Sequence, residues 1–322
     1  MKIAIIGCGE MGWQHAECLT SFPQIELFAF CDQDLQRAQQ MQHHFQGEIA
    51  TDDPALIWEK PDIHVVYITT HTNSHRDLCK RAIQAKKHFM VEKPLALTSR
   101  EALEIYEYYE LHAPSLIAMS AFKFRFYEMI QKARTLLSSV YMISVQIMDD
   151  PWPADFWANQ ANVGGGNVLS QGVHGTDLLR YLADSEPDHV YAVGKNYHQS
   201  TRVVDNLSAT FYFKNGISGT LIVGDCAEAP LVGKFMVQMH GREGSLLLTD
   251  RLTRLKFKSA TGSGIQEWKG EESGFMEENR HFLSALLGNR YIPSTLWDGY
   301  MAQLMIDSAI ESARKKRLKE IG

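Results

Sequence analysis

Lys93 is followed directly by Pro94, at the end of an apolar run, and this pairing suits a lysine that takes part in chemistry. Proline disfavours helical geometry for the residue before it, so we expect Lys93 in extended or turn backbone. Proline also accepts a cis peptide bond more readily than other residues, usually in a tight turn. A long cation is therefore held on stiff backbone, where it could donate a hydrogen bond to a substrate oxygen that gains negative charge.

Four polar side chains recur at helical spacing within residues 167–183: Ser170, His174, Asp177 and Tyr181. At 100° per residue they fall within one narrow arc of a helix, just after three consecutive glycines. A purely structural helix would place aliphatic side chains on such a face. An imidazole can take up and return a proton near neutral pH, and Asp177 could fix its tautomer and orientation. The alternative is that His174 is a core histidine satisfied by Asp177, and Tyr181 fits either core packing or support.

A glycine-rich motif, G-x-G-x-x-G, occupies residues 7–12 directly after the apolar run at residues 2–6. Its glycines allow a tight turn and a close approach of a pyrophosphate to the N-terminus of the following helix. Asp32 lies 20 residues beyond Gly12, where a carboxylate can accept hydrogen bonds from a ribose 2′-hydroxyl. Because the same carboxylate would repel a 2′-phosphate, the sequence favours NAD. Arg37 keeps NADP open as an alternative.

Strands and helices alternate around these residues, which predicts a doubly wound parallel sheet of the Rossmann type. Strands are predicted at residues 2–6, 25–32, 64–69 and 87–91, and a helix at residues 74–86. Ligands of such sheets collect at the carboxyl ends of the strands, which places Lys93 beside a bound nicotinamide. The residues predicted to bind the cofactor there are Gly7, Gly9, Glu10, Met11, Gly12, Asp32, Arg37, Thr70, His71, Asn73, His75 and Glu92.

His71 and His75 lie four residues apart, a spacing that can also hold a metal ion. They fall at a strand end, however, and no third histidine, cysteine or carboxylate has recognisable zinc spacing. We therefore expect no metal site and interpret these histidines as part of the loop that lines the cofactor.

The pattern changes beyond residue 122 to strands joined by hairpin signals. Segments 207–213 and 217–223 flank Asn215-Gly216, a strong short hairpin signal. We therefore predict a dinucleotide-binding domain at residues 1–122 and an α+β domain built on a mainly antiparallel open sheet at residues 123–322. The final helix could pack back on the first domain. A sheet face left uncovered by helices favours a homo-oligomer, a homodimer or homotetramer.

The composition fits a globular protein that acts on small molecules. The 322 residues are 45% hydrophobic and 22% charged, with a net charge of −6, so no electrostatic feature recruits nucleic acid or an anionic membrane. We find no signal peptide, and no apolar run is long enough to cross a bilayer. The five cysteines show neither disulfide-framework nor metal spacing, so we expect a reducing, cytoplasmic setting.

An ordered set of motifs along almost the whole chain resembles the glucose–fructose oxidoreductase/inositol dehydrogenase (Gfo/Idh/MocA) family. The motifs are GCGEMG at 7–12, TTHTNSH at 69–75, Glu92-Lys93-Pro94, Phe124-Arg125-Phe126, the glycines 164–166, and GVHGTD at 172–177 with Arg180-Tyr181. The resemblance implies the two domains predicted above and places Lys93 beside the nicotinamide, hydrogen-bonded to the substrate hydroxyl that is oxidised. Two positions depart from the family pattern: His71 replaces a common proline, and Ser170 replaces the aspartate of the inositol dehydrogenase branch.

These features together predict an NAD(P)-dependent dehydrogenase that moves a hydride between nicotinamide and a hydroxyl or keto carbon of a sugar, sugar derivative or cyclic polyol. Lys93, His174 and Asp177 are the predicted catalytic group. The predicted substrate-lining residues are Lys123, Arg125, Trp152, Asp155, Trp157, Asn162 and Ser170. Two alternatives stay open: a non-catalytic regulator that senses NAD and a sugar, and an NAD-dependent glycosidase.

Overall fold

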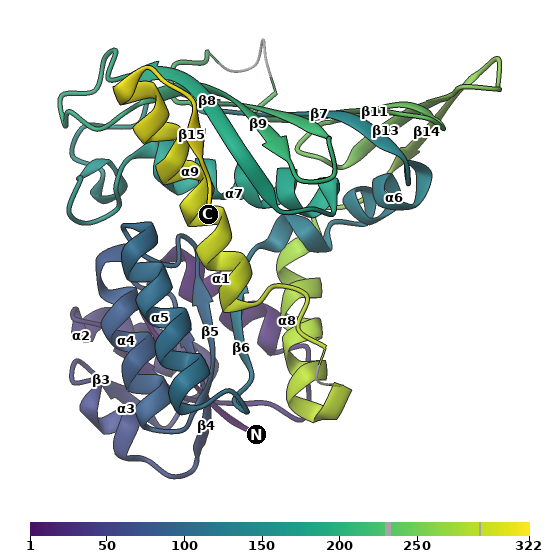
Figure 1. Cartoon of the computed structure of the whole chain (residues 1–322). Helices are drawn as coiled ribbons and strands as arrows, with labels where there is room; N and C mark the ends of the chain where they lie inside the picture. Colours follow the sequence, from purple (N-terminus) through teal and green to yellow (C-terminus); the bar gives the residue numbers. More distant parts are fainter. Residues whose placement is uncertain (229–232, 290) are drawn as a thin grey trace. The chain divides into compact units, whose positions relative to one another are not determined.

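A computed structural model describes residues 1–228, 233–289 and 291–322 (Figure 1). The chain divides into two compact units. The first comprises Met1–Phe122 and Phe275–Tyr300, and the second comprises Lys123–Gly274 and Met301–Gly322. Residues 275–300, which were predicted to be part of the second domain, belong to the first unit, and the chain enters that unit twice.

The first unit contains a six-stranded sheet in the order β3-β2-β1-β4-β5-β6, whose described pairs are all parallel. Its strands are β1 (Lys2–Ile6), β2 (Glu26–Cys31), β3 (Ile49–Thr51), β4 (Ile63–Ile68), β5 (His88–Glu92) and β6 (Ala118–Ala121). The strand order reverses between β1 and β4, so their carboxyl ends lie side by side at the switch point where such sheets bind ligands. The predicted doubly wound sheet is confirmed.

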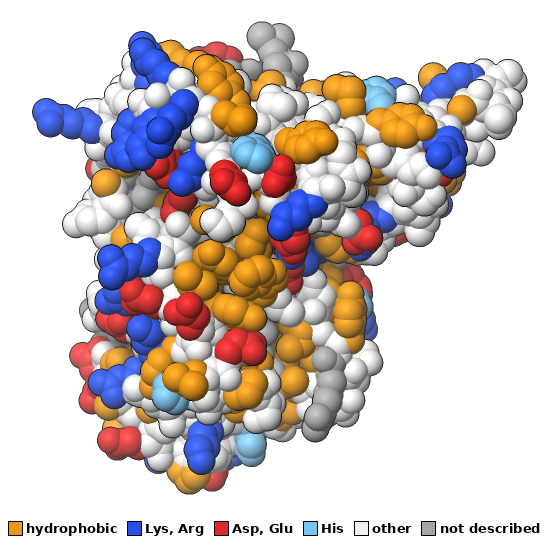
Figure 2. Space-filling model, in the orientation of Figure 1, with side chains coloured by type: hydrophobic (Ala, Val, Ile, Leu, Met, Phe, Trp, Pro, Cys, Tyr) orange, Lys and Arg blue, Asp and Glu red, His pale blue; other side chains and the backbone are white. Residues whose placement is uncertain are grey.

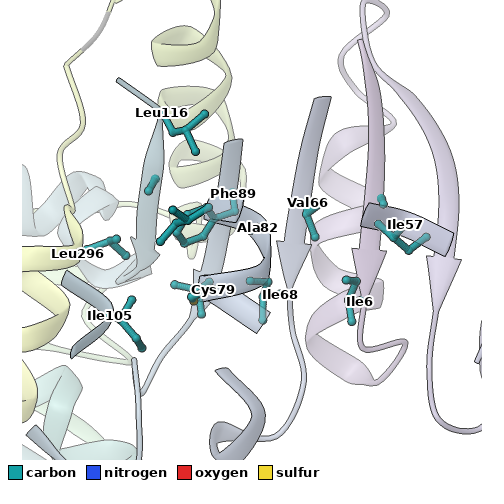
Figure 3. Packing of buried hydrophobic residues seen from close by; sticks show 14 of the residues in the cluster. Ile6, Ile57, Val66, Ile68, Cys79, Ala82, Phe89, Ile105, Leu116 and Leu296 are labelled. Carbon is teal, nitrogen blue, oxygen red and sulfur yellow. The ribbon is translucent and has the colours of Figure 1, made fainter. Parts of the chain in front are cut away.

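The core of the first unit lies between this sheet and its helices. The helices are α1 (Glu10–Leu19), α2 (Leu35–Phe45), α3 (Ala55–Glu59), α4 (Thr72–Gln84), α5 (Ser99–His112) and α8 (Gly274–Ser284), followed by a short π-helical turn, η3 (Ala285–Asn289). Ile6, Val66, Ile68 and Phe89 are buried in one cluster, because a parallel sheet covered on both faces has no wet side (Figure 3). Leu296 joins the same cluster, so the returning segment completes this core.

The second unit is built on a nine-stranded sheet in the order β14-β13-β12-β11-β7-β10-β9-β8-β15. Its strands are β7 (Val140–Met148), β8 (Pro187–Lys195), β9 (Asn206–Phe213), β10 (Ser218–Gly224), β11 (Phe235–Gly241), β12 (Gly244–Thr249), β13 (Arg254–Ser259), β14 (Ile265–Lys269) and β15 (Lys319–Glu320). The described pairs are antiparallel except β7 with β10, which confirms the predicted mainly antiparallel sheet. Asn215-Gly216 connects β9 to β10, with Gly216 at φ +88°.

One face of this sheet is covered by α7 (Asn167–Ala183). A Cβ atom at Gly175 would lie 2.4 Å from a methyl group of Leu221 on β10, so the missing side chain lets the helix lie close to the strands. The remaining helices of this unit are α6 (Glu128–Leu136), α9 (Leu296–Lys315, which begins in the first unit), and the short η1 (Lys123–Phe126) and η2 (Trp157–Asn159). The hydroxyl of Thr176 on α7 donates to the carbonyl of Ala302 on α9 at 2.8 Å, which ties the two helices together.

The surface carries charged side chains of both signs, as the composition predicts (Figure 2). Figure 2 shows acidic and basic side chains interspersed over most of the face in view. Within the described part of the chain, no helix combines the length and the apolar character that crossing a membrane requires. All five cysteines are free thiols.

Candidate active site

The three glycines of the motif at residues 7–12 have different surroundings. At Gly7 the backbone has φ +102°, and a Cβ would lie 2.5 Å from the carbonyl carbon of Thr69. At Gly12 a Cβ would lie 2.2 Å from the oxygen of Gly7, so packing excludes any side chain. At Gly9, by contrast, no atom lies within 4 Å of an added Cβ, and this residue precedes α1 without any side-chain cap. The space in front of a helix N-terminus is therefore open, as binding of a pyrophosphate requires.

Asp32 follows β2 and is anchored beside this loop. Its Oδ2 accepts from the backbone N–H of Cys8 at 2.7 Å, and its Oδ1 accepts from that of Asp34 at 2.9 Å. The guanidinium of Arg37 is exposed, and its Nε lies 3.5 Å from Oδ2 of Asp34. Burial and the charge of Asp32 raise the pKa of the Cys8 thiol far above its usual range, which favours the protonated thiol. The carboxylate of Asp32 is therefore fixed beside the glycine motif by two backbone hydrogen bonds.

The loop after β4 and the first turn of α4 carry four of the predicted cofactor-binding residues. Thr70, His71 and Asn73 are exposed or half-buried around the N-terminus of α4, where His71 is the N-cap residue. His75 is different, because its ring is buried: Nδ1 lies 2.8 Å from the carbonyl oxygen of Pro94, and Nε2 lies 3.0 Å from that of Thr70. His75 thus ties the loop after β4 to the turn after β5. Among the described residues, no group of His, Cys, Asp or Glu could hold a metal ion.

Lys93 leaves the carboxyl end of β5, and its peptide bond to Pro94 is cis. Glu92 is buried, and its Oε2 accepts from the backbone N–H of Lys93 at 3.0 Å. Its other oxygen lies 3.1 Å from Nε2 of His15 on α1. Glu92 therefore supports the backbone of Lys93, a role that differs from the cofactor-lining position predicted for it. His15 was not identified from the sequence, although it lies on the buried face of α1 with Gly12, Ala16 and Leu19.

In the second unit, α7 covers residues 167–183 as predicted and holds Ser170, His174 and Asp177 in buried positions. The ring of His174 packs 4.5 Å from that of Phe124, measured between ring centroids. Asp177 accepts from the guanidinium of Arg125, with Nε 2.9 Å from Oδ2. The predicted partner of Asp177 was His174, and Arg125 was predicted to line the substrate, so this buried ion pair was missed.

The remaining predicted substrate residues lie on η1 or in the loop between β7 and α7. Lys123 is half-buried on η1, and Asp155 and Asn162 are exposed. Trp152 and Trp157 are half-buried, and Phe156 contacts both rings, at centroid distances of 5.2 and 5.6 Å. The buried Asn159 holds this loop by donating to the carbonyls of Trp152 and Pro153. The loop therefore presents a cluster of three aromatic rings, of which Phe156 was not predicted.

Two family models match the chain. Residues 1–115 match the oxidoreductase family with an NAD-binding Rossmann fold, GFO_IDH_MocA, and residues 133–247 match the GFO/IDH/MocA C-terminal domain. Each model covers the body of one unit, and the two matches belong to the same family. The first unit is thus an NAD-binding Rossmann domain.

Individual relatives resemble the chain over most of its length. It is 25% identical to a myo-inositol 2-dehydrogenase of Thermotoga maritima, over 98% of this chain and 97% of that one. It is 26% identical to a scyllo-inositol 2-dehydrogenase (NAD(+)) of Bacillus subtilis, over 88% and 85%. A solved structure of levoglucosan dehydrogenase in complex with NADH and levoglucosan superimposes with a TM-score of 0.91, at 22% identity and over 100% and 99% of the two chains. That structural likeness shows that the fold is shared.

Proposed function

The chain belongs to the Gfo/Idh/MocA family of oxidoreductases, and from this premise we propose that it interconverts a hydroxyl and a keto group on a sugar, sugar derivative or cyclic polyol. The observation that carries the proposal is the open space at Gly9 before the uncapped N-terminus of α1, with Asp32 fixed beside it. The relatives named for inositol and levoglucosan support the substrate class.

A bound nicotinamide supplies the hydride transfer, and the protein places the substrate and handles the proton. Lys93 is proposed to donate to the oxygen of the substrate as it becomes an alkoxide, since a positioned cation stabilises the charge that develops there. His174 is proposed to take the hydroxyl proton in oxidation and return it in reduction. Glu92 holds the backbone of Lys93, and Asp177 together with Arg125 holds the α7 face that carries His174.

NAD is the proposed cofactor in preference to NADP. The carboxylate of Asp32 is held by two backbone N–H groups, so it cannot turn away from a 2′-phosphate without losing both hydrogen bonds. Arg37, the residue that could accommodate such a phosphate, lies near the competing carboxylate of Asp34.

The substrate is proposed to be a ring that carries several hydroxyl groups. Trp152, Phe156 and Trp157 offer aromatic surface for the apolar face of such a ring. Ser170 is a hydroxyl donor and acceptor where the inositol dehydrogenase branch has an aspartate, so we propose a substrate contact that is a neutral hydrogen bond.

A homodimer or homotetramer is proposed from the sheet of the second unit. The strand register places five exposed apolar side chains on the face opposite α7: Met142, Tyr191, Val193, Tyr212 and Ile222. Together they span four adjacent strands, β7, β10, β9 and β8. A second copy of the chain would bury this area. The free thiols fit the proposed location in the reducing cytoplasm.

The test is nicotinamide absorbance over time, with NAD and then NADP, against a panel of cyclic polyols, aldoses and sugar acids. We expect turnover of one substrate group with NAD, and a loss of kcat of about a hundredfold or more in the Lys93→Ala variant with NAD binding retained. Normal turnover of the variant would overturn the role of Lys93. If the absorbance does not change with any substrate of the panel while NAD still binds, the result favours the non-catalytic regulator. If a glycoside releases its aglycone without net formation of NADH, the result favours the NAD-dependent glycosidase.

A further inference from the structure

A buried chain of hydrogen bonds runs from the core of the first unit to the backbone of Lys93. His15 on α1 is 0% exposed, and its Nε2 lies 3.1 Å from Oε1 of Glu92. Oε2 of Glu92 accepts from the N–H of Lys93 at 3.0 Å. The carboxylate of Glu92, 6% exposed, therefore joins α1 to the residue that ends β5.

The position of the ring proton of His15 follows from its second partner. Nδ2 of Asn279 donates to the carbonyl of Phe275 at 2.7 Å, which identifies that atom as the amide nitrogen. The same nitrogen lies 3.0 Å from Nδ1 of His15, so Nδ1 accepts and the ring proton is on Nε2, directed at Glu92. The hydroxyl of Tyr67 donates to Oδ1 of Asn279 at 2.9 Å and completes the chain.

A carboxylate this deeply buried needs donors for its oxygens, because an unsatisfied buried charge is costly. Glu92 receives one N–H from His15 on one oxygen and one from Lys93 on the other. Removal of the donor at His15 takes away one of the groups that hold this carboxylate in place, so the acceptor of the Lys93 backbone N–H becomes less firmly fixed. The side chain of Lys93 would then start from a less defined backbone position.

We propose that His15 is a positioning residue for Lys93 and acts through Glu92. This inference rests on the proposed function, in which Lys93 meets the substrate oxygen. In this proposal α1 has two functions. Its N-terminus follows the glycine loop, and its second turn, which carries His15, supports the backbone of Lys93. Asn279 sets the tautomer that this support requires.

The decisive variants are His15→Leu, which removes the donor at similar volume, and His15→Gln, whose amide nitrogen can reach about as far as Nε2. We expect His15→Leu to lower kcat roughly tenfold to hundredfold, since a misplacement of about 1 Å can have that effect. The dissociation constant of NAD should change little, and the isotope effect with deuterated substrate should rise as the chemical step slows. His15→Gln should recover much of kcat. If His15 had only a structural role, NAD affinity and kcat would fall together, and they would fall equally in His15→Leu and His15→Gln.

A second readout needs no turnover. With ¹⁵N-lysine labelling, the amide of Lys93 is identified by its absence in Lys93→Arg, and its hydrogen exchange is measured without cofactor. Exchange should accelerate about tenfold or more in His15→Leu and return toward the wild-type rate in His15→Gln. His43→Leu, at an exposed histidine of α2, is the matched control and should leave both readouts unchanged.

The outcomes separate this inference from the proposed function. If the wild type is active and Lys93→Ala is not, normal kcat and normal Lys93 exchange in His15→Leu overturn the inference and leave the function intact. If the wild type turns over no substrate, the function fails, and the exchange rates still decide whether His15 fixes the backbone of Lys93. Should His15→Leu not fold, Asn279→Ala removes the partner of Nδ1 and carries the same expectations.

Discussion

Arg125 and Asp177 form a buried ion pair across 52 positions of sequence, with Nε 2.9 Å from Oδ2 and Nη2 2.5 Å from Oδ1. Their side chains are 5% and 2% exposed. Asp177 lies on α7 three residues after His174, and Arg125 lies on η1 beside Phe124, whose ring contacts that histidine. The pair therefore joins α7, which carries His174, to η1, whose Phe124 packs against the His174 ring.

Replacing Asp177 with Asn should lower the free energy of unfolding by about 3 kcal/mol or more, because a buried guanidinium would lose the negative charge of Asp177. The matched control is Asp184→Asn. Asp184 pairs with Arg134 at 3.2 Å, but its side chain is 86% exposed, so that change should cost less than about 1 kcal/mol. Urea unfolding of both variants measures the difference, and equal losses would show that burial does not govern the strength of the Arg125–Asp177 pair.

Alanine substitutions in the glycine loop should separate folding from cofactor binding. Gly9→Ala meets no atom within 4 Å and keeps an allowed backbone, with φ −83°, so the melting temperature should stay near that of the wild type. Its affinity for NAD should fall about tenfold or more, since the methyl group enters the space before α1. Gly12→Ala collides with the oxygen of Gly7 and should lower the melting temperature as well. Isothermal titration and thermal unfolding test both, and unchanged NAD affinity in Gly9→Ala would contradict the proposed pyrophosphate position.

His75 should make stability depend on pH. Burial lowers the pKa of its imidazole below the ordinary 6.5, against the opposing effect of the carbonyls of Pro94 and Thr70. Below pH 6.5 the imidazole therefore takes up a proton more readily in the unfolded chain than in the folded chain. The contribution of His75 to the free energy of unfolding is intact above that pH and is lost as the pH falls toward the pKa of the folded state.

Urea unfolding between about pH 7.5 and pH 5.5 tests this dependence. In His75→Gln the fall in unfolding free energy should be shallower than in the wild type, by up to about 1.4 kcal/mol per pH unit. His43→Gln, at an exposed histidine, is the control and should keep the wild-type slope. Parallel slopes in the wild type and His75→Gln would show that the His75 ring does not resist protonation.

Asp32→Ser should relax the choice of cofactor. The substitution removes the negative charge that opposes a 2′-phosphate, while serine can still hydrogen-bond a ribose hydroxyl. We expect the ratio of kcat/KM for NAD to that for NADP to fall about tenfold or more, chiefly through KM. A ratio that stays at the wild-type value would indicate that another residue selects the cofactor. Arg37→Gln, measured in parallel, should lower NADP use only if that guanidinium contacts the phosphate.

Local patterns made much of the fold predictable from the sequence. The run at residues 2–6 with its glycine loop, the alternation of strands and helices, and Asn215-Gly216 between β9 and β10 each specify backbone within a few neighbouring residues. The bounds and the polar face of the helix at residues 167–183 were predictable, because the polar side chains recur in the sequence with the 3.6-residue period of an α-helix. The short strand β3 and the strands β13 and β14 were missed, since they carry weaker patterns.

The contacts that support the groups proposed to react were decided by the tertiary structure alone. Asn279 meets His15 across 264 positions, and Arg125 meets Asp177 across 52. No periodicity encodes such partners. The first pair depends on the return of residues 275–300 to the first unit, and the second depends on the packing of η1 against α7. The sequence by itself therefore determined which groups could do chemistry. Which buried donors and charges hold them in place followed only from packing, where most buried polar atoms are hydrogen-bonded.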